Sequence, residues 1–210
     1  MQVSVDYFIE KLHVEHQTNR FSMGPDESLR PLKSFIQRNA LDFQNHNVAV
    51  TYAAVVPPVD PNDRNSRKRV IGYVTLTCSE IDLGGSYPLE DCEAANRYDS
   101  MSALKVARLA THRDYLGNQI GKTLMEFAIA LAVHQVAQFV GCRFLVTDSK
   151  AGSVGFYRDK LGFTLLDTEE NRGRDHPVMF LDLNKLDLTA PQDIQDMDES
   201  EDNVQEIAPA

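Results

Sequence analysis

The sequence predicts a single α/β domain, with a mixed central sheet of about six to seven strands flanked by about four helices. Three observations lead to this prediction. Apolar runs rich in β-branched residues alternate with amphipathic helical segments along the chain. A long helical segment separates two strand-like runs, as in a crossover between parallel strands. The 210 residues and the hydrophobic content of 42% suit one globular domain with a proper core.

The amino-terminal half predicts a helix followed by a β-hairpin. In residues 26–44 apolar side chains recur at helical spacing, and with Asp26 as the cap we expect the helix to begin near Ser28. Residues 48–56 and 69–81 are rich in β-branched and aromatic side chains, which is typical of strands. The segment between them contains three prolines and predicts the connecting loop.

The carboxyl-terminal half predicts a strand–loop–helix unit, a further strand and a final hairpin. Residues 82–103 show no clean periodicity and indicate an irregular insertion, after which residues 104–111 form a strand. Residues 120–140 predict a long amphipathic helix, which Gly141 ends. The remaining expected elements are strands at 143–148, 163–167 and 177–183 and a short helix at 152–160 closed by Gly162.

Charge is distributed unevenly along the chain. The net charge is −10, but residues 187–210 contain eight acids and no Lys or Arg, so that residues 1–186 carry about −2. We expect this tail to be disordered, either as a solubilising segment or as a docking or autoinhibitory one. The body has a single compact basic cluster, which either grips a phosphate or forms a solvated loop tip. Its members are Arg64, Arg67, Lys68 and Arg69.

Several classes of site and partner are not expected. The three cysteines and six histidines have no metal-like spacing, so we expect no metal site. The amino-terminal residues lack the pattern of a secretory signal, and no stretch approaches a membrane span, which makes the cytoplasm the expected location. We expect no DNA or membrane partner, and a homodimer stays open.

The run THRDYLGNQIGKT joins the strand at 104–111 to the long helix. A strand that passes through a glycine turn into a helix points unpaired N–H groups and the positive helix end at an anion such as a pyrophosphate. Gly117 can take a positive φ and Gly121 leaves room where the helix starts. Arg113, Asn118 and Lys122 can add donors to this loop.

The glycine spacing excludes two common phosphate motifs. Three residues rather than four separate the glycines, which rules out a Walker A loop. Gln119 occupies the middle glycine position of a dinucleotide-binding loop. On spacing alone an ordinary turn remains the alternative to a pyrophosphate cradle.

The second informative run is GFYRDKLGF, residues 155–163. A tyrosine on a short helix beside two parallel strands can place its hydroxyl at their carboxyl ends. With an ordinary pKa near 10, the phenol of Tyr157 stays protonated and can donate a proton to a leaving group. The alternative is a core aromatic side chain, which is the interpretation we adopt for Phe156 and Phe163.

Together, RLATHRDYLGNQIGKTLMEFA and FLVTDSKAGSVGFYRDKLGF resemble the GCN5-related N-acetyltransferase (GNAT) superfamily in order and separation. The resemblance covers roughly residues 20–185 and implies a single GNAT-like domain in residues 1–186. The family's acetyl-CoA loop usually reads Gln-Gly-x-Gly-x-Gly, with which LGNQIG aligns. Gly117 and Gly121 match, whereas Leu116 and Gln119 depart. We expect acetyl-CoA to bind through main-chain N–H groups, more weakly than in the family's usual loop.

The resemblance also implies a mechanism with acetyl-CoA as co-substrate. A bound amine attacks the thioester directly through a tetrahedral intermediate, without an acyl-enzyme, and Tyr157 protonates the departing CoA thiolate. Leu109 and Thr111 offer main-chain groups to the pantetheine arm, and the N–H near Leu109 stabilises the oxyanion. The implied acetyl-CoA-binding residues are Leu109, Ala110, Thr111, Leu116, Gly117, Asn118, Gln119, Ile120, Gly121 and Lys122.

A narrower resemblance, to the GNAT-type toxins of bacterial toxin–antitoxin systems, rests on FSMGPDESLRPLKSFIQRNA with VIGYVTLT and VARLAT. It implies the α-amine of aminoacyl-tRNA as acceptor. Such an amine has a pKa of about 8 and needs no dedicated base. His112 and Asp148 could act through water, and the alternative for each is a structural role. Met23 departs from a usual cysteine.

The near-neutral body argues against a tRNA partner, because phosphate contacts supply most of the affinity for nucleic acid. The acceptor therefore stays open between aminoacyl-tRNA, a small-molecule amine and a protein amine. A non-catalytic acyl-CoA-binding or interaction module is the alternative to an enzyme.

Overall fold

The computed structural model describes residues 5–58 and 67–186. These form one seven-stranded sheet in the order β1-β2-β3-β4-β5-β7-β6. Only β4 and β5 are parallel neighbours. The strands are β1 (Phe8–Lys11), β2 (Val50–Val56), β3 (Arg69–Asp82), β4 (Ser100–Thr111), β5 (Phe144–Asp148), β6 (Thr164–Leu165) and β7 (Val178–Asp182). The predicted mixed α/β domain is confirmed, and β1 is a strand that the sequence did not indicate.

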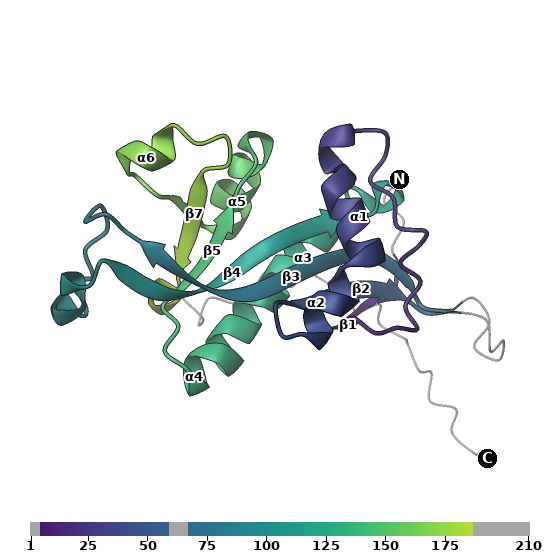
Figure 1. Ribbon diagram of the computed structural model, residues 1–210, viewed down its shortest axis with the longest axis horizontal. Helices are drawn as coiled ribbons and strands as arrows, with labels where there is room; N and C mark the ends of the chain where they lie inside the picture. Colours follow the sequence, from purple (N-terminus) through teal and green to yellow (C-terminus); the bar gives the residue numbers. More distant parts are fainter. Residues whose placement is uncertain (1–4, 59–66, 187–210) are drawn as a thin grey trace, which may run out of the picture.

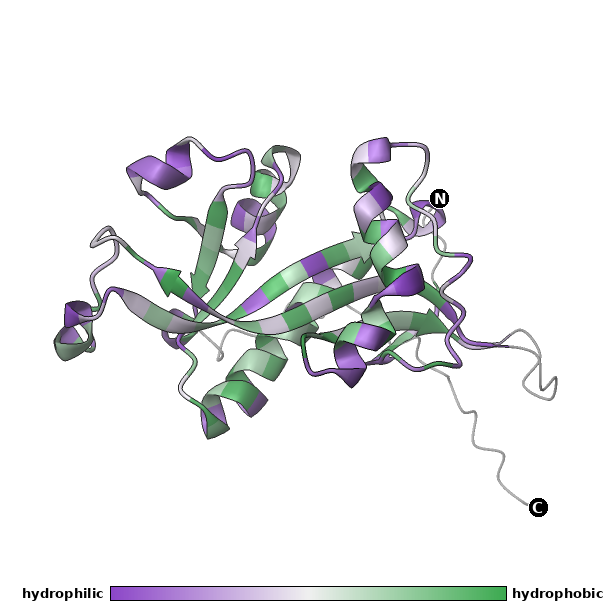
Figure 2. Ribbon diagram, viewed as in Figure 1, coloured by the Kyte–Doolittle hydropathy of each residue, from purple (hydrophilic) through white to green (hydrophobic). Residues whose placement is uncertain are grey.

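Helices cover both faces of the sheet (Figure 1). The helices are α1 (Arg30–Arg38), α2 (Ala40–Asn45), α3 (Ile120–Leu131), α4 (Ala137–Phe139), α5 (Val154–Leu161) and α6 (Glu169–Arg172). Figure 2 shows that the hydrophobic residues gather in the sheet and in α3, whereas α6 is mostly hydrophilic.

The alternation of side chains along β3 assigns the helices to their faces. Tyr73 packs in the cluster under α1, and its hydroxyl donates to the Leu32 carbonyl at 2.7 Å. Its neighbour Val74 turns to the other face and joins Leu124 of α3 in the main core cluster. Successive strand residues point to opposite faces, so one strand supports both layers.

The predicted helix at 26–44 consists of three pieces. Asp26 caps it as expected, accepting the Ser28 N–H at 2.8 Å, but the first turn, Glu27–Leu29, is a 3₁₀ helix. The chain then breaks at Asn39 between α1 and α2. Asn39 makes no side-chain cap hydrogen bond, and asparagine is among the weaker helix formers.

The long helix begins as predicted but departs from its expected course after Leu131. A π-helical turn, Ala132–Val136, connects α3 to α4. This turn rotates the apolar face of the predicted amphipathic helix, so the apolar side chain of Phe139 is 83% exposed. The helix ends because Val140 is extended, with φ −139°, one residue before the predicted terminator Gly141.

By length and composition alone, one described helix, Ile120–Phe139, could cross a membrane. Its first half packs against the sheet through Ile120, Leu124, Met125 and Ala128, all fully buried. The core helix of a globular domain passes the same test, so this feature does not by itself indicate a membrane span.

The predicted insertion at 82–103 is shorter than expected, because β4 already begins at Ser100 and pairs with Asp82 of β3. The remaining residues form the tip of a long hairpin. Tyr87 packs this tip against Phe144 and Phe180 of the sheet. Its hydroxyl also donates to Asp182. The tip is therefore anchored on the body of the domain.

The segment between the last two strands contains a helix where the sequence predicts only a polar turn. Thr168 caps α6 by accepting the Asn171 N–H. The buried side chain of Asn171 donates to the carbonyls of Leu166 and Val178 and ties the helix to the final hairpin. The acidic tail at 187–210 and Arg64 of the basic cluster lie outside the described residues.

Candidate active site

The central feature of the candidate site is the point where β4 and β5 separate. The two strands pair only from Ala103 opposite Phe144 to Val106 opposite Thr147. The register of β3 with β4 shifts between Thr75 and Leu76, which leaves Ala107 as a bulge in β4. Beyond this bulge β4 continues beside β3 while β5 turns away towards α5 (Figure 1).

Within the described residues, this separation leaves the β5-side edge of β4 without a strand partner beyond Val106. The His112 N–H donates to the Ile71 carbonyl of β3 at 2.8 Å. Because main-chain groups of successive strand residues point to opposite edges, those of Ala110 also face β3. The N–H and C=O groups of Leu109 and Thr111 then face the open edge. The main-chain groups of Leu109 and Thr111 are therefore available to a ligand, whereas those of Ala110 are not.

Tyr157 lies at the base of the opening between the strands. Its side chain is 7% exposed, and its ring packs edge-on against Phe156 and Phe163. Burial raises the pKa of Tyr157, and a hydrogen bond with the Thr147 side chain opposes part of that shift. The phenol therefore keeps its proton through neutral pH.

The glycine loop enters α3 through two residues with left-handed backbone. Gly117 has φ +85° and Gln119, the cap residue of α3, has φ 55°. The first helical bond runs from Thr123 N–H to the Gln119 carbonyl, so the N–H groups of Ile120, Gly121 and Lys122 have no partner within the helix. These N–H groups point towards the space beyond the helix start.

Two other loop amides are already engaged in the turn before α3. The N–H of Leu116 donates to the Arg113 carbonyl and that of Asn118 to the Tyr115 carbonyl, each at 3.4 Å. The Asn118 side chain donates to the same Tyr115 carbonyl. The structure thus concentrates the available donors of the predicted cradle at the helix start.

The left-handed conformation of Gln119 is less stable than it would be for glycine, because a side chain disfavours this region. We expect Gln119→Gly to raise the free energy of unfolding by about 1 kcal/mol and to tighten acetyl-CoA binding. Urea unfolding and calorimetry measure the two effects. Asn118→Gly is the matched control, because Asn118 does not have a positive φ; an equal gain in that variant would contradict the explanation.

The start of α3 is placed by a glycine that the sequence analysis did not single out. A Cβ atom at Gly72 of β3 would lie 2.6 Å from the Ile120 side chain and 3.1 Å from that of Leu124. Only glycine allows this close approach of helix and strand. Gly72 therefore determines where the N–H groups of α3 point.

Two adjoining clefts receive the predicted site residues. A cleft of about 640 Å³ contains Tyr157 together with Leu109, Ala110, Thr111, Leu116 and Gly121. A second, of about 760 Å³, contains Thr111, Leu116, Gly117, Gln119, Ile120, Gly121 and Lys122. Asn118 lines neither cleft. Thr111, Leu116, Gly121 and Phe156 border both, so the two clefts form one continuous path.

The two candidate bases are both engaged by neighbouring groups. The His112 ring accepts the Asp114 N–H at Nδ1 and contacts the Arg20 carbonyl through Nε2, at 3.2 Å each. Asp148 forms an ion pair with Lys105 at 2.5 Å. Of the basic cluster, Lys68 pairs with Glu10, and Arg69 contacts the Tyr115 hydroxyl beside the glycine loop. Lys68 and Arg69 are therefore not a free loop tip.

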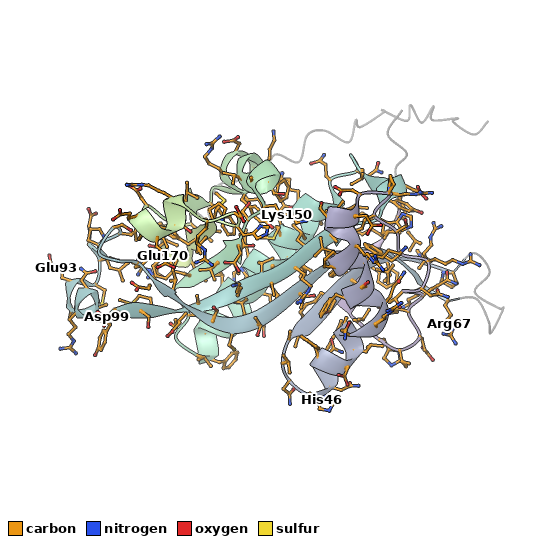
Figure 3. The ribbon with its side chains drawn as sticks, turned by 45° about the horizontal axis from the view of Figure 1, so that its top comes forward. His46, Arg67, Glu93, Asp99, Lys150 and Glu170 are labelled. Carbon is orange, nitrogen blue, oxygen red and sulfur yellow. The ribbon has the colours of Figure 1, made fainter. Side chains whose placement is uncertain are left out.

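Cations from three separate elements line the larger cleft. Arg108 of β4 stacks on Phe35 of α1, 3.8 Å from the ring centroid, and forms no ion pair with a described residue. Lys150 donates to the Ser28 carbonyl and Arg174 follows α6. Figure 3 shows Lys150 above the sheet, between α1 and α6. The sequence did not indicate these residues as part of the site, although an arginine within the apolar run of β4 is unusual.

Apolar side chains form the wall of the larger cleft on the side of α1. They are Met23, Leu29 and Leu32. A third cleft, of about 410 Å³, lies between the hairpin tip and α6 and shares Asp148 and Arg174 with the larger one. Within the described residues, no group of three or more His, Cys, Asp or Glu side chains is placed to hold a metal ion.

Comparison with solved structures shows that this arrangement is a known fold. A Tyr-to-Phe mutant of KacT superimposes with a TM-score of 0.69 at 18% identity, over 85% of this chain and 95% of that one. AtaT complexed with acetyl-methionyl-tRNAfMet gives 0.68 at 20% identity, over 85% and 96%. AtaTR bound with acetyl-CoA gives 0.61 at 20% identity, over 85% and 94%.

At these identities the likeness shows the fold, while the family follows from the sequence. No curated protein matches the chain significantly. The model of the acetyltransferase (GNAT) family, however, matches residues 64–163, which include β3, β4, the glycine loop, α3 and Tyr157. Over these residues the chain carries a domain that matches the acetyltransferase (GNAT) family.

Proposed function

We propose that this protein transfers the acetyl group of acetyl-CoA directly to a primary amine in the cytoplasm, with Tyr157 as general acid. One observation carries the proposal. The buried hydroxyl-bearing side chain of Tyr157 shares a cleft with Leu109, on the strand edge that β5 has left. A proton donor thus lies beside main-chain groups that can bind a thioester.

The residues fit acetyl-CoA from end to end. Leu109 and Thr111 pair with the amide groups of the pantetheine arm along the open edge of β4. The N–H groups at the start of α3 and the positive end of its dipole bind the pyrophosphate. Along the path through both clefts we expect the thioester to lie near Tyr157 and the nucleotide to lie beyond Gly117.

In the chemical step the N–H of Leu109 stabilises the negative charge that develops on the acetyl oxygen. The amine enters from the side of α1, where Arg108 and Lys150 line the larger cleft. As the carbon–sulfur bond breaks, Tyr157 gives its proton to the sulfur, and the proton lost by the amine leaves through solvent. No dedicated base is required for an α-amine, whose pKa is about 8.

The charges around the cleft favour aminoacyl-tRNA as the acceptor. The body is near neutral overall, yet Arg108, Lys150 and Arg174 gather at the acceptor side, where Asp148 is balanced by Lys105. These cations suit the phosphates beside a tRNA terminus, and the apolar wall suits an amino-acid side chain. The structural neighbour AtaT is complexed with acetyl-methionyl-tRNAfMet, which supports this choice.

The direct test is a thiol-release assay with acetyl-CoA across charged tRNAs, small amines and amine-bearing peptides. We expect CoA release and acetylation with charged tRNA, and neither with deacylated tRNA. Turnover with only small or peptide amines would overturn the acceptor assignment. Acetyl-CoA binding without release for any acceptor would instead indicate a non-catalytic module. Expression in a bacterium should arrest growth, and normal growth with unmodified charged tRNA would contradict the toxin-like activity.

Arg108 provides a sharper test of the acceptor site. We expect Arg108→Gln to lower kcat/KM for charged tRNA about tenfold, because a charge-assisted contact to phosphate is lost. Acetyl-CoA binding should not change. Arg97→Gln, on the exposed hairpin tip, is the matched control. Equal losses in both variants would show that the effect does not depend on the cleft.

A further inference from the structure

The second cleft has a feature that pyrophosphate binding does not explain. Two lysines from different helices line it, Lys122 from the first turn of α3 and Lys160 from the last turn of α5. The N–H groups at the helix start lie on the α3 side of this cleft. Lys160 therefore adds a second positive charge, from α5, to the lining of this cleft.

Two carboxylates lie near these lysines, and each already has a cationic partner. Lys122 pairs with Glu126 one turn further along α3, at 3.3 Å. Asp159, which also lines the cleft, is held by Arg158 at 2.7 Å. Hydrogen bonds from Arg158 lower the pKa of Asp159, and the nearby charge of Lys160 lowers it further. Lys160 forms no ion pair with a described residue, and its side chain is exposed to the cleft.

The chemistry of CoA indicates which group the ammonium group of Lys160 would bind. CoA carries a pyrophosphate and, on its ribose, a separate 3′-phosphate. The helix start and Lys122 satisfy the pyrophosphate, which leaves the 3′-phosphate as the remaining anion. A volume of about 760 Å³ is enough for the nucleotide end of the molecule.

We propose that Lys160 binds the 3′-phosphate of CoA and makes the enzyme selective for CoA over 3′-dephospho-CoA. This inference rests on the proposed placement of acetyl-CoA along the two clefts. An ammonium group on a flexible stem suits a phosphate at an open site, where it acts as a point charge. Selectivity for the donor then depends on α5, the same helix that carries Tyr157.

Calorimetric titration with CoA and with 3′-dephospho-CoA tests this assignment. The wild-type protein should bind CoA about tenfold more tightly than the dephospho form. Lys160→Met should abolish this preference by weakening only CoA binding, whereas Lys122→Met should weaken both ligands equally. Lys11→Met, an exposed lysine on β1, is the matched control and should change neither.

The outcomes of these titrations distinguish a failure of the role of Lys160 from a failure of the proposed function. A wild-type preference that Lys160→Met leaves intact, or an equal loss of both ligands in that variant, would overturn the role of Lys160. If the wild-type protein binds neither form, the proposed function itself fails. Circular dichroism of each variant checks that the fold is retained, which we expect because Lys160 is exposed.

Discussion

Tyr157→Phe is expected to reduce the rate of acetyl transfer at least about tenfold while leaving acetyl-CoA affinity unchanged. The substitution removes only the hydroxyl, and the ring keeps its packing between Phe156 and Phe163. The thiolate then leaves without a positioned proton donor, which raises the barrier of the chemical step alone. Single-turnover kinetics and calorimetry with acetyl-CoA separate the two effects.

The pH dependence gives a second measurement of the same role. The protonated phenol is the active form, and burial raises the pKa of Tyr157 above its usual value. Activity therefore should not fall as the pH rises through the range in which an acceptor α-amine loses its proton, at about 8. It should fall only above the raised pKa of the phenol.

The control for Tyr157 is Phe163→Leu, which perturbs the same aromatic packing but keeps the hydroxyl. It should lower stability far more than it lowers the rate. Unchanged turnover in Tyr157→Phe would remove this residue from the mechanism.

Gly117→Val is expected to abolish measurable acetyl-CoA binding. At φ +85° a β-branched residue is strongly disfavoured, so the loop must leave its conformation or carry strain. No heavy atom lies within 4 Å of a Cβ atom built there, so the loss does not come from a clash inside the protein. It comes from the altered backbone and from a side chain in the space that the phosphates need. Calorimetry with acetyl-CoA measures the effect.

Gly141→Val is the matched control for this substitution. Gly141 is also exposed and also has no atom within 4 Å of a Cβ atom, but its φ is not positive. This variant should bind acetyl-CoA as the wild type does. Retained affinity in Gly117→Val would show that the loop assignment is wrong.

Most of the secondary structure could be predicted from the sequence, because periodicity and caps are local properties. The hairpin of β2 and β3, the crossover through α3, the cap at Asp26 and the close of α5 at Gly162 all follow the prediction. The elements that the sequence did not predict leave only weak local signals. β1 has only four residues, and the π-helical turn changes the face of the long helix without a proline or glycine to signal it.

The residues of the candidate site were largely named by the sequence, since Gly117 and Tyr157 belong to local motifs. The tertiary structure alone shows why they lie together. The bulge at Ala107 lets β4 part from β5, and Gly72 admits α3 against the sheet. Both depend on contacts between segments far apart in the chain.

The conformation of Gln119 and the position of the cations in the clefts are also properties that only the tertiary structure shows. The sequence determined that a glycine position of the loop is occupied by glutamine, and the structure shows that this residue adopts the left-handed conformation nonetheless. Sequence alone established a near-neutral body, whereas folding gathers Arg108, Lys150 and Arg174 around one cleft. Composition sums charge over the chain, but binding depends on where packing places each charge.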